Sequence, residues 1–457
     1  RYKLAVLNVE YDLGWASAVS ESAWVNKHSH TYLENTRNKV PNAPVGLVAI
    51  DGGGDSDTYS QELRLVSADQ PGDRWRWIAG VFASRQEIHE VVNLDAGNST
   101  LPAALNGGLL DSLIPGLGQE VDAMGNVSLI DLNPHVTIRE LALFGNVTRK
   151  LGDAWELTLG GRLYKTDSFG TNLQQGVVFT ALNGSPQFVQ HGGVAEHGFN
   201  PQLSLAWHAT DELMSYATVA KGFRVGGLQP GITLPTSKTQ APPTFKSDTI
   251  WSYELGQRTS WFGRTLNVDV AAFHIDWKNP QVQQPDSTSG VAYLDNAGGV
   301  KSDGAELNLR WLTPVGLMLS SGMTYAKTVT TEPFLSGTGQ MSMPGDPWPY
   351  APRLQTSTTL AYPLDLAGWV VTPSLTHAYL GKTVNNLGEQ KPIFNYHQLD
   401  AQIGLANPQW SWAPQLTISV NNVLDTRGVT TNVTQGPSTD VNYCQPRTLI
   451  VHLGGQF

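Results

Sequence analysis

Hydrophobic and polar residues alternate along most of this chain, and the alternating segments come in pairs joined by short turns. A period of two residues is typical of a β-strand with one apolar and one polar face. The pattern predicts an all-β chain of about 17 strands. The expected strands are Tyr2–Asp12, Ala16–Lys27, Tyr59–Ser67, Trp75–Ile88, Thr137–Arg149, Glu156–Thr166, Asn200–Ala209, Leu213–Phe223, Thr249–Thr259, Thr265–Gln284, Val291–Trp311, Leu317–Thr328, Arg353–Tyr362, Trp369–Leu380, His397–Ala406, Gln415–Leu424 and Gln445–Phe457.

Connections between these strands alternate between short and long. Short turns include LGW at 13–15 and TDE at 210–212. The long segments are 27–58, 90–135, 167–199, 225–246, 329–352, 381–395 and 425–443. A soluble β-sandwich has no reason to keep every second connection short, whereas a transmembrane barrel has tight periplasmic turns and long extracellular loops. The alternation therefore favours an antiparallel transmembrane β-barrel.

Tryptophan placement supports the same interpretation. Strand alternation alone leaves a soluble sandwich open, because its apolar face would be buried rather than lipid-facing. The tryptophans in or near the short turns are Trp15, Trp75, Trp77, Trp155, Trp207, Trp261, Trp311, Trp369, Trp410 and Trp412. An aromatic belt at one membrane interface produces this clustering, although local packing against turns is an alternative explanation.

Composition excludes several other classes. Only 15% of the 457 residues are charged, and the chain holds 46 glycines and 14 tryptophans, which is typical neither of disorder nor of a helical bundle. The net charge is −10 without a dense basic patch, so nucleic acid is not an expected partner. No nucleophile elbow, phosphate loop or Cys-x-x-Cys occurs, and the single Cys444 cannot form a disulfide within the chain. We expect neither an enzyme nor a cofactor.

Several segments, in order, resemble the TonB-dependent receptors of Gram-negative outer membranes. They are FNPQLSLAWHATDELMSYATVAKGFRVGG at 199–227, SYELGQRTSWFGRTLNVDVAAFHIDW at 252–277, DNAGGVKSDGAELNLRW at 295–311, VNNVLDTRG at 420–428 and QPRTLIVHLGGQF at 445–457. The resemblance implies a barrel of about 22 strands around an N-terminal plug, located in the outer membrane. It also implies import of a scarce nutrient, most simply a ferric siderophore or similar iron chelate, driven by the periplasmic protein TonB.

The sequence departs from that family at its beginning, where no plug or coupling box precedes the first strand. If the last strand ends in the periplasm, strand parity places Arg1 on the outer side, whereas a native chain should enter from the periplasm. We therefore expect residues 1–457 to be an N-terminally incomplete barrel domain that lacks the plug and about five strands. The TonB contact would lie in the missing part. The alternatives are a passive porin-like or surface-binding barrel and a soluble carbohydrate-binding protein.

The stretch VAKGFRVGGLQPG at 219–231 ends a strand with an aromatic residue and a cation. Phe223 is expected at the outer interface, Arg224 in the headgroups or the lumen, and the next two glycines at the start of an extracellular loop. Arg224 and Arg37 are candidate contacts for an anionic chelate. His28 and His30 share one face if extended and can ligate a metal or haem iron, but a solvated loop is the plainer interpretation.

A Glu-Leu pair recurs on four strands, and the glutamates are expected to line the lumen because the leucines face lipid. These glutamates are Glu62, Glu140, Glu254 and Glu306. They can contact a plug or a passing cation, or simply pair with the lumen arginines Arg64 and Arg162. The terminal Phe457 is expected to serve barrel assembly.

One strand changes its apolar phase. In LNVDVAAFHIDW at 266–277, Val270 belongs to one alternating set and Phe273 to the other. This predicts a β-bulge near Ala271 or Ala272, or an exit from the bilayer at that height.

Overall fold

The computed structural model describes residues 1–34, 48–70, 72–96, 127–176, 185, 187–230, 241–285, 292–337, 339–388, 390–435 and 438–455. Its main sheet contains 18 strands. These are β1 (Tyr2–Asp12), β2 (Ala16–Glu34), β3 (Val48–Ser67), β4 (Trp75–Ala96), β5 (Val127–Leu151), β6 (Trp155–Gln175), β7 (Gln187–Thr210), β8 (Leu213–Arg224), β11 (Asp248–Trp261), β12 (Leu266–Lys278), β15 (Val300–Leu312), β16 (Met318–Thr330), β19 (Leu354–Ala361), β20 (Leu364–Leu366), β21 (Trp369–Leu380), β24 (Tyr396–Ala406), β25 (Gln415–Asn421) and β28 (Thr448–Gly454).

Two-stranded hairpins occupy the connections at one end of this sheet. They are β9 (Gly227–Leu228) with β10 (Thr244–Phe245), β13 (Gln281–Pro285) with β14 (Ala292–Asn296), β17 (Phe334–Leu335) with β18 (Met341–Ser342), β22 (Thr383–Val384) with β23 (Pro392–Ile393), and β26 (Val429–Gln435) with β27 (Ser438–Tyr443). Among the described residues, no helix is long and apolar enough to span a membrane.

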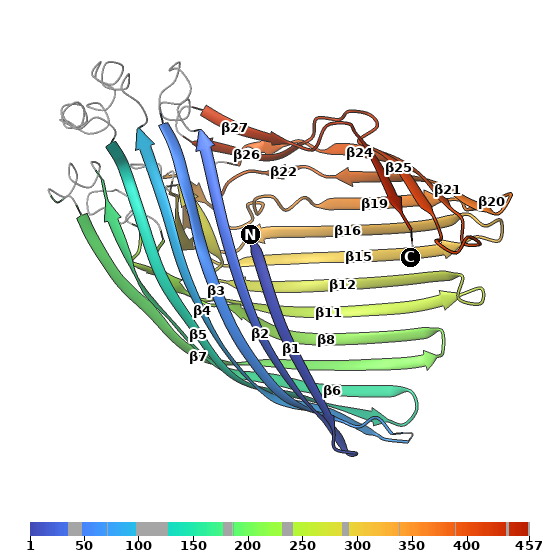
Figure 1. Cartoon of the computed structure of the whole chain (residues 1–457). Coiled ribbons are helices and arrows are strands. Elements are labelled where there is room, and N and C mark those ends of the chain that lie inside the picture. Colours follow the sequence, from blue (N-terminus) through green and yellow to red (C-terminus); the bar gives the residue numbers. More distant parts are fainter. Residues whose placement is uncertain are drawn as a thin grey trace.

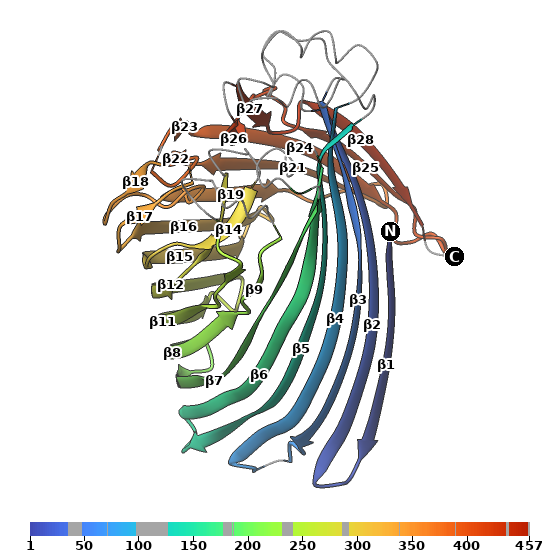
Figure 2. The same cartoon turned by 90° about the vertical axis from the view of Figure 1, so that its left-hand side faces the viewer.

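The long strands of the main sheet follow one another as an antiparallel meander, from β1 paired with β2 to β25 paired with β28. The sheet is strongly curved, with the short turns at one end and the long connections at the other (Figures 1 and 2). In the described pairings, β1 and β28 each have one strand neighbour and form the two edges of the sheet. This arrangement confirms the expected number of strands, their antiparallel pairing and the alternation of short and long connections.

One face of the sheet is apolar and exposed, and the other is polar. On β6 and β7, the exposed fractions are 56% for Leu159, 55% for Leu163 and 45% for Leu203. Arg162, which lies between the two leucines of β6, points to the opposite, polar face and pairs there with Glu140. An exposed apolar surface on so many adjacent strands fits a bilayer rather than water.

Tryptophans mark the turn end of the apolar face, as expected. Trp155 and Trp207 are direct cross-strand partners whose rings stack 5.7 Å apart. Trp15, Trp75, Trp261, Trp410 and Trp412 are exposed near the same end. Because indoles have an apolar ring and a polar N–H group, this row suits an interface between hydrocarbon and water.

Strands β2 to β7 are much longer than the sequence pattern indicates. The pattern begins the fifth strand at Thr137, whereas β5 begins at Val127 and has 25 residues. About 10 residues suffice for a strand to cross a bilayer. The extensions lie toward the upper left in Figure 1, at the end of the sheet opposite the short turns. Their apolar residues are interrupted by polar residues, glycine or proline, as in VSLIDLNPHV at 127–136, so regular apolar alternation does not reveal them even though Ile130 and Leu132 are buried. Gly53 shows that the extensions are tightly packed, because a Cβ atom there would lie 2.7 Å from the Ser29 carbonyl oxygen.

Two of the expected strands are each divided in two. The segment Thr265–Gln284 forms β12 and β13, separated by Asn279 and Pro280, and Asn279 has a φ of 53°. The segment Val291–Trp311 forms β14 and β15. A left-handed backbone conformation followed by proline redirects the chain, so the outer halves form a separate hairpin.

The expected bulge in β12 is not present. The ladders from β12 to β11 and to β15 run without a register shift through Ala271 and Ala272. Phe273 therefore lies on the polar face, whereas Ala272 and His274 continue the face of Val270. The alternative, that the strand leaves the bilayer at this height, stays a prediction.

Adjacent residues on β7 provide a test of the two faces. Leu203 is on the apolar face, and Gln202 is exposed on the polar face. We expect Leu203→Arg to lower the free energy of unfolding in lipid vesicles by about 2–4 kcal/mol, because it places a charge against hydrocarbon. Gln202→Arg should change it little. Urea unfolding monitored by tryptophan fluorescence measures both, and equal losses would contradict the assignment of faces.

Candidate ligand site at the loop end of the sheet

The connection after β8 folds back against the polar face of the extended strands. Its hairpin β9–β10 contacts β6 and β7, within the space that the sheet curves around (Figure 2). Leu228 is buried there against Gly192. A Cβ atom at Gly192 would lie 2.8 Å from the Leu228 side chain, so glycine allows the close approach. The loop is therefore a layer packed on the polar face of β6 and β7, which we call the wall.

Gln229 joins this loop to the neighbouring one. Its side-chain amide accepts a hydrogen bond from the Leu294 backbone N–H at 2.9 Å and donates to the Leu294 carbonyl at 2.6 Å. The next residue, Asp295, has a carboxyl whose pKa is raised by burial, an effect opposed by the hydrogen bond from the Asn296 N–H. A buried amide that bonds both backbone groups of one residue acts as an additional strand partner for β14.

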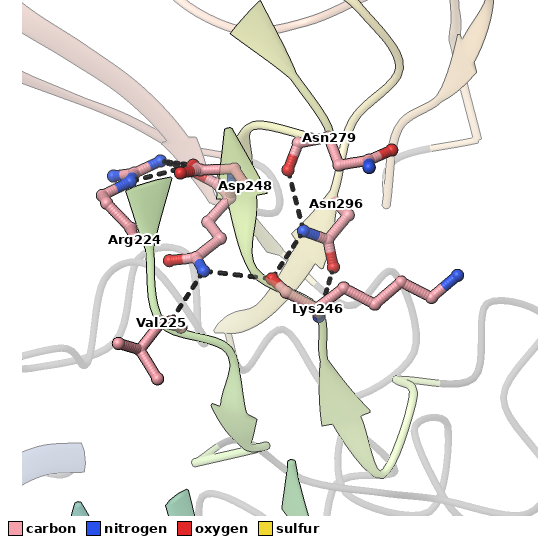
Figure 3. A network of polar contacts seen from close by, with 7 residues as sticks. Arg224, Val225, Lys246, Asp248, Asn279 and Asn296 are labelled. Carbon is pink, nitrogen blue, oxygen red and sulfur yellow. Dashed lines mark hydrogen bonds and ion pairs between the residues drawn. The ribbon is translucent and has the colours of Figure 1, made fainter. Parts of the chain in front are cut away.

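Arg224 ends β8 and is held by Asp248 at the start of β11. The Arg224 Nε atom donates to Asp248 Oδ2 at 2.8 Å, and the carboxylate is 3% exposed (Figure 3). The guanidinium also lies 5.1 Å from the ring of Trp277, with half of the side chain exposed. Arg224 therefore closes the base of the loop and still presents a cationic surface to solvent.

Two amides complete the loop base. Gln281 donates to the carbonyl oxygens of Val225 and Lys246 at 2.9 and 3.0 Å, and Asn296 bonds both backbone groups of Lys246 (Figure 3). The two ends of the β9–β10 loop come so close that a Cβ atom at Gly226 would lie 2.5 Å from the Phe245 carbonyl oxygen. This explains the glycine at position 226, just after the end of β8, because a side chain there would collide with the other end of the loop.

Three side chains at this junction form what we call the mouth cluster: Arg224, Trp277 and Trp348. The two indole rings lie 5.7 Å apart at 54°. Trp348 comes from the connection before β19 and is held by a backbone hydrogen bond to Thr328 at 3.0 Å. A half-exposed cation beside two indoles can bind a flat or anionic ligand by stacking and charge. No group of three or more His, Cys, Asp or Glu residues in the described part of the chain is arranged to bind a metal.

His28 and His30 lie away from this cluster. Both belong to strand β2 rather than to the solvated loop that the sequence favoured, and their register places them on the face of Leu63. His28 Nδ1 is 2.9 Å from Asp55 Oδ1, and His30 Nδ1 is 3.5 Å from Asp51 Oδ1. Arg37 lies outside the described residues.

The four glutamates of the Glu-Leu pairs lie on the polar face, in different surroundings. Glu62 pairs with Arg64, and Glu140 pairs with Arg162. Glu254 accepts a hydrogen bond from the Tyr216 hydroxyl. Glu306 lines a hollow with Gln355 and Gln398 and has no ion pair among the described residues. Phe457 lies outside the described residues.

Sequence reasoning missed most of the mouth cluster and its supports. The sequence pattern gives no binding role to Trp277, Trp348, Gln229 or Asp248. The signal that could have identified Asp248 is its position: it is the first residue of β11 and pairs with Arg224, the last residue of β8. Trp348 and Gln229 lie in connections without periodicity, so no sequence pattern places them.

Known proteins share this architecture. Residues 2–423 match the family model described as TonB dependent receptor-like, beta-barrel. The ferric yersiniabactin uptake receptor FyuA from Yersinia pestis shares 18% identity with a TM-score of 0.77, covering 100% of this chain and 61% of that chain. The siderophore receptor PiuA from Acinetobacter baumannii shares 16% with a TM-score of 0.70, covering 99% and 64%.

A third structure, the ferric-catecholate import receptor Fiu from E. coli K12, shares 14% identity with a TM-score of 0.67, covering 100% of this chain and 64% of that chain. The chain thus spans less than two thirds of the length of all three receptors. At these identities, the structures show a shared fold, and the family model covers most of the sequence. The chain therefore belongs to the TonB-dependent receptor family, as a β-barrel of that family.

Proposed function

We propose that this barrel serves an outer-membrane receptor that imports a ferric siderophore or similar iron chelate. The observation that carries the proposal is that the structures named above, which share this fold, are described as receptors for ferric yersiniabactin, a siderophore and ferric catecholates. Because the chain spans only part of those proteins, the transport activity is proposed for the protein that contains this barrel.

The mouth cluster supports a ligand of this class. A ferric chelate is commonly a compact anion with planar aromatic or carboxylate arms. Arg224 offers charge and the indoles of Trp277 and Trp348 offer stacking surfaces. Their supporting amides are already bonded in the described structure, so this side of the site needs little ordering when ligand binds.

The proposed partners and domain organisation follow from the same family. The chain covers 61% to 64% of the length of the receptors named above. We infer that further strands and a plug complete the barrel in the Gram-negative outer membrane, and that TonB acts through that additional part.

Substitution in the mouth cluster tests the site. We expect Trp277→Ala to weaken binding about tenfold, equivalent to about 1.4 kcal/mol, and Arg224→Gln to act in the same direction. The probes are ferric citrate, ferric yersiniabactin and a ferric catecholate, measured by isothermal titration on the protein from the complete coding sequence. Trp261→Ala, at the turn end of β11, is the matched control. If one of these chelates binds and all variants bind it like the parent, the cluster is not the site.

Energy coupling tests the transport class separately. Cells that express the complete coding sequence should accumulate radioactive iron from a bound chelate, and loss of TonB should abolish accumulation while leaving surface binding intact. Uptake that persists at the same rate without TonB would identify a passive, porin-like barrel instead. Surface binding without uptake in either strain would identify a binding protein.

A further inference from the structure

Several buried oxygen atoms on the polar face of β6 and β7 have no hydrogen-bond partner among the described residues, and three of them lie close together. These three are Thr166 Oγ1, Ser168 Oγ and Glu196 Oε2. Thr166 is 0% exposed and Ser168 is 2% exposed. Buried polar atoms almost always have a partner, so such a group needs a physical explanation.

The register brings these atoms together. Thr166 and Glu196 are direct cross-strand partners, which places their Cβ atoms about 5 Å apart. Ser168 follows Thr166 on the same face of β6, about 7 Å further along the strand. The three side chains therefore border one small region of the wall.

The base of the β9–β10 loop covers this region. The Ser247 backbone N–H donates to Glu196 Oε1 at 3.3 Å. On the other side, Ser168 Oγ would lie 3.2 Å from a Cβ atom at Gly227. Both ends of the loop therefore lie against the wall here, beside these side chains.

The charge of Glu196 is not balanced by an ion pair in the described part of the chain. The arginine on the same face of β6, Arg162, is already paired with Glu140, which lies directly across from Thr166 on β5. A half-buried carboxylate oxygen without a counter-charge is costly, and a cation is the group that removes this cost.

We propose that Glu196, Thr166 and Ser168 form a site for a hard cation, with Ca²⁺ as the best-suited occupant. One carboxylate and two hydroxyl oxygens are ligands that such ions prefer, and flexible coordination at 2.3–2.6 Å allows Ca²⁺ to take additional backbone or water oxygens. The bound ion fastens the base of the β9–β10 loop to the wall, close to the mouth cluster but separate from it.

Calcium titration of the protein from the complete coding sequence, purified in detergent, tests the site. We expect CaCl₂ to raise the melting temperature of the parent chain, followed by circular dichroism, more than NaCl of equal ionic strength does. Glu196→Gln should weaken Ca²⁺ binding at least about tenfold in calorimetry. Glu254→Gln is the matched control, because that carboxylate also lies on the polar face and already accepts the Tyr216 hydroxyl.

A second variant tests the site if Glu196→Gln does not fold. Thr166→Val with Ser168→Ala removes both hydroxyls and keeps the charge, and it should also weaken Ca²⁺ binding. The proposal is overturned if the folded parent chain binds no Ca²⁺, or if Glu196→Gln and Glu254→Gln bind it equally. In either case the three oxygen atoms are satisfied by water alone.

Discussion

The antiparallel backbone ladder is the constraint on which the rest of the structure depends. A bilayer offers no partner to a backbone N–H or C=O group, so every strand that crosses it must bond a neighbour along its length. The ladder between β5 and β6 runs without a register shift from Leu151 to Asp131. This regularity fixes the face of each side chain, so one residue of slip would exchange the lipid-facing and polar sets. The same ladder continues above the membrane, where it carries the wall that the loops use.

Loop structure at the outer end depends on a different interaction, the bonding of side-chain amides to backbone. Gln229, Gln281 and Asn296 each bond backbone groups of another segment. Short hairpins cannot bury much apolar surface, and amides supply the partners that a longer sheet would otherwise provide. The consequence is a loop held in one position by directional bonds. Such a loop can present Arg224 and its neighbouring indoles in a fixed geometry.

The sequence predicts the fold well where apolar alternation meets a bilayer, and poorly elsewhere. Trp369–Leu380 is predicted to the residue because Gly368 precedes it and lipid contact imposes alternation on it. The extension of β5 back to Val127 is missed because its apolar residues do not alternate over a long run: Ile130 and Leu132 are buried, but Asn133 and Pro134 interrupt the pattern. For the site, Arg224 is identifiable from its place at a strand end. Trp348 is not, because only tertiary structure brings its aperiodic segment to β12.

Arg224 illustrates why a strand-end cation need not have a single role. Its ion pair with the buried Asp248 is needed to close the loop base, since an unpaired buried carboxylate would be costly. This pairing offsets the charge of Arg224, so the cation alone attracts an anionic ligand weakly. The exposed half of its side chain lies beside Trp277, however, and that indole holds the guanidinium plane from one side. Under the proposed function, a ligand that contacts Arg224 also contacts an aromatic surface, so a ligand that is both planar and anionic fits this part of the mouth best.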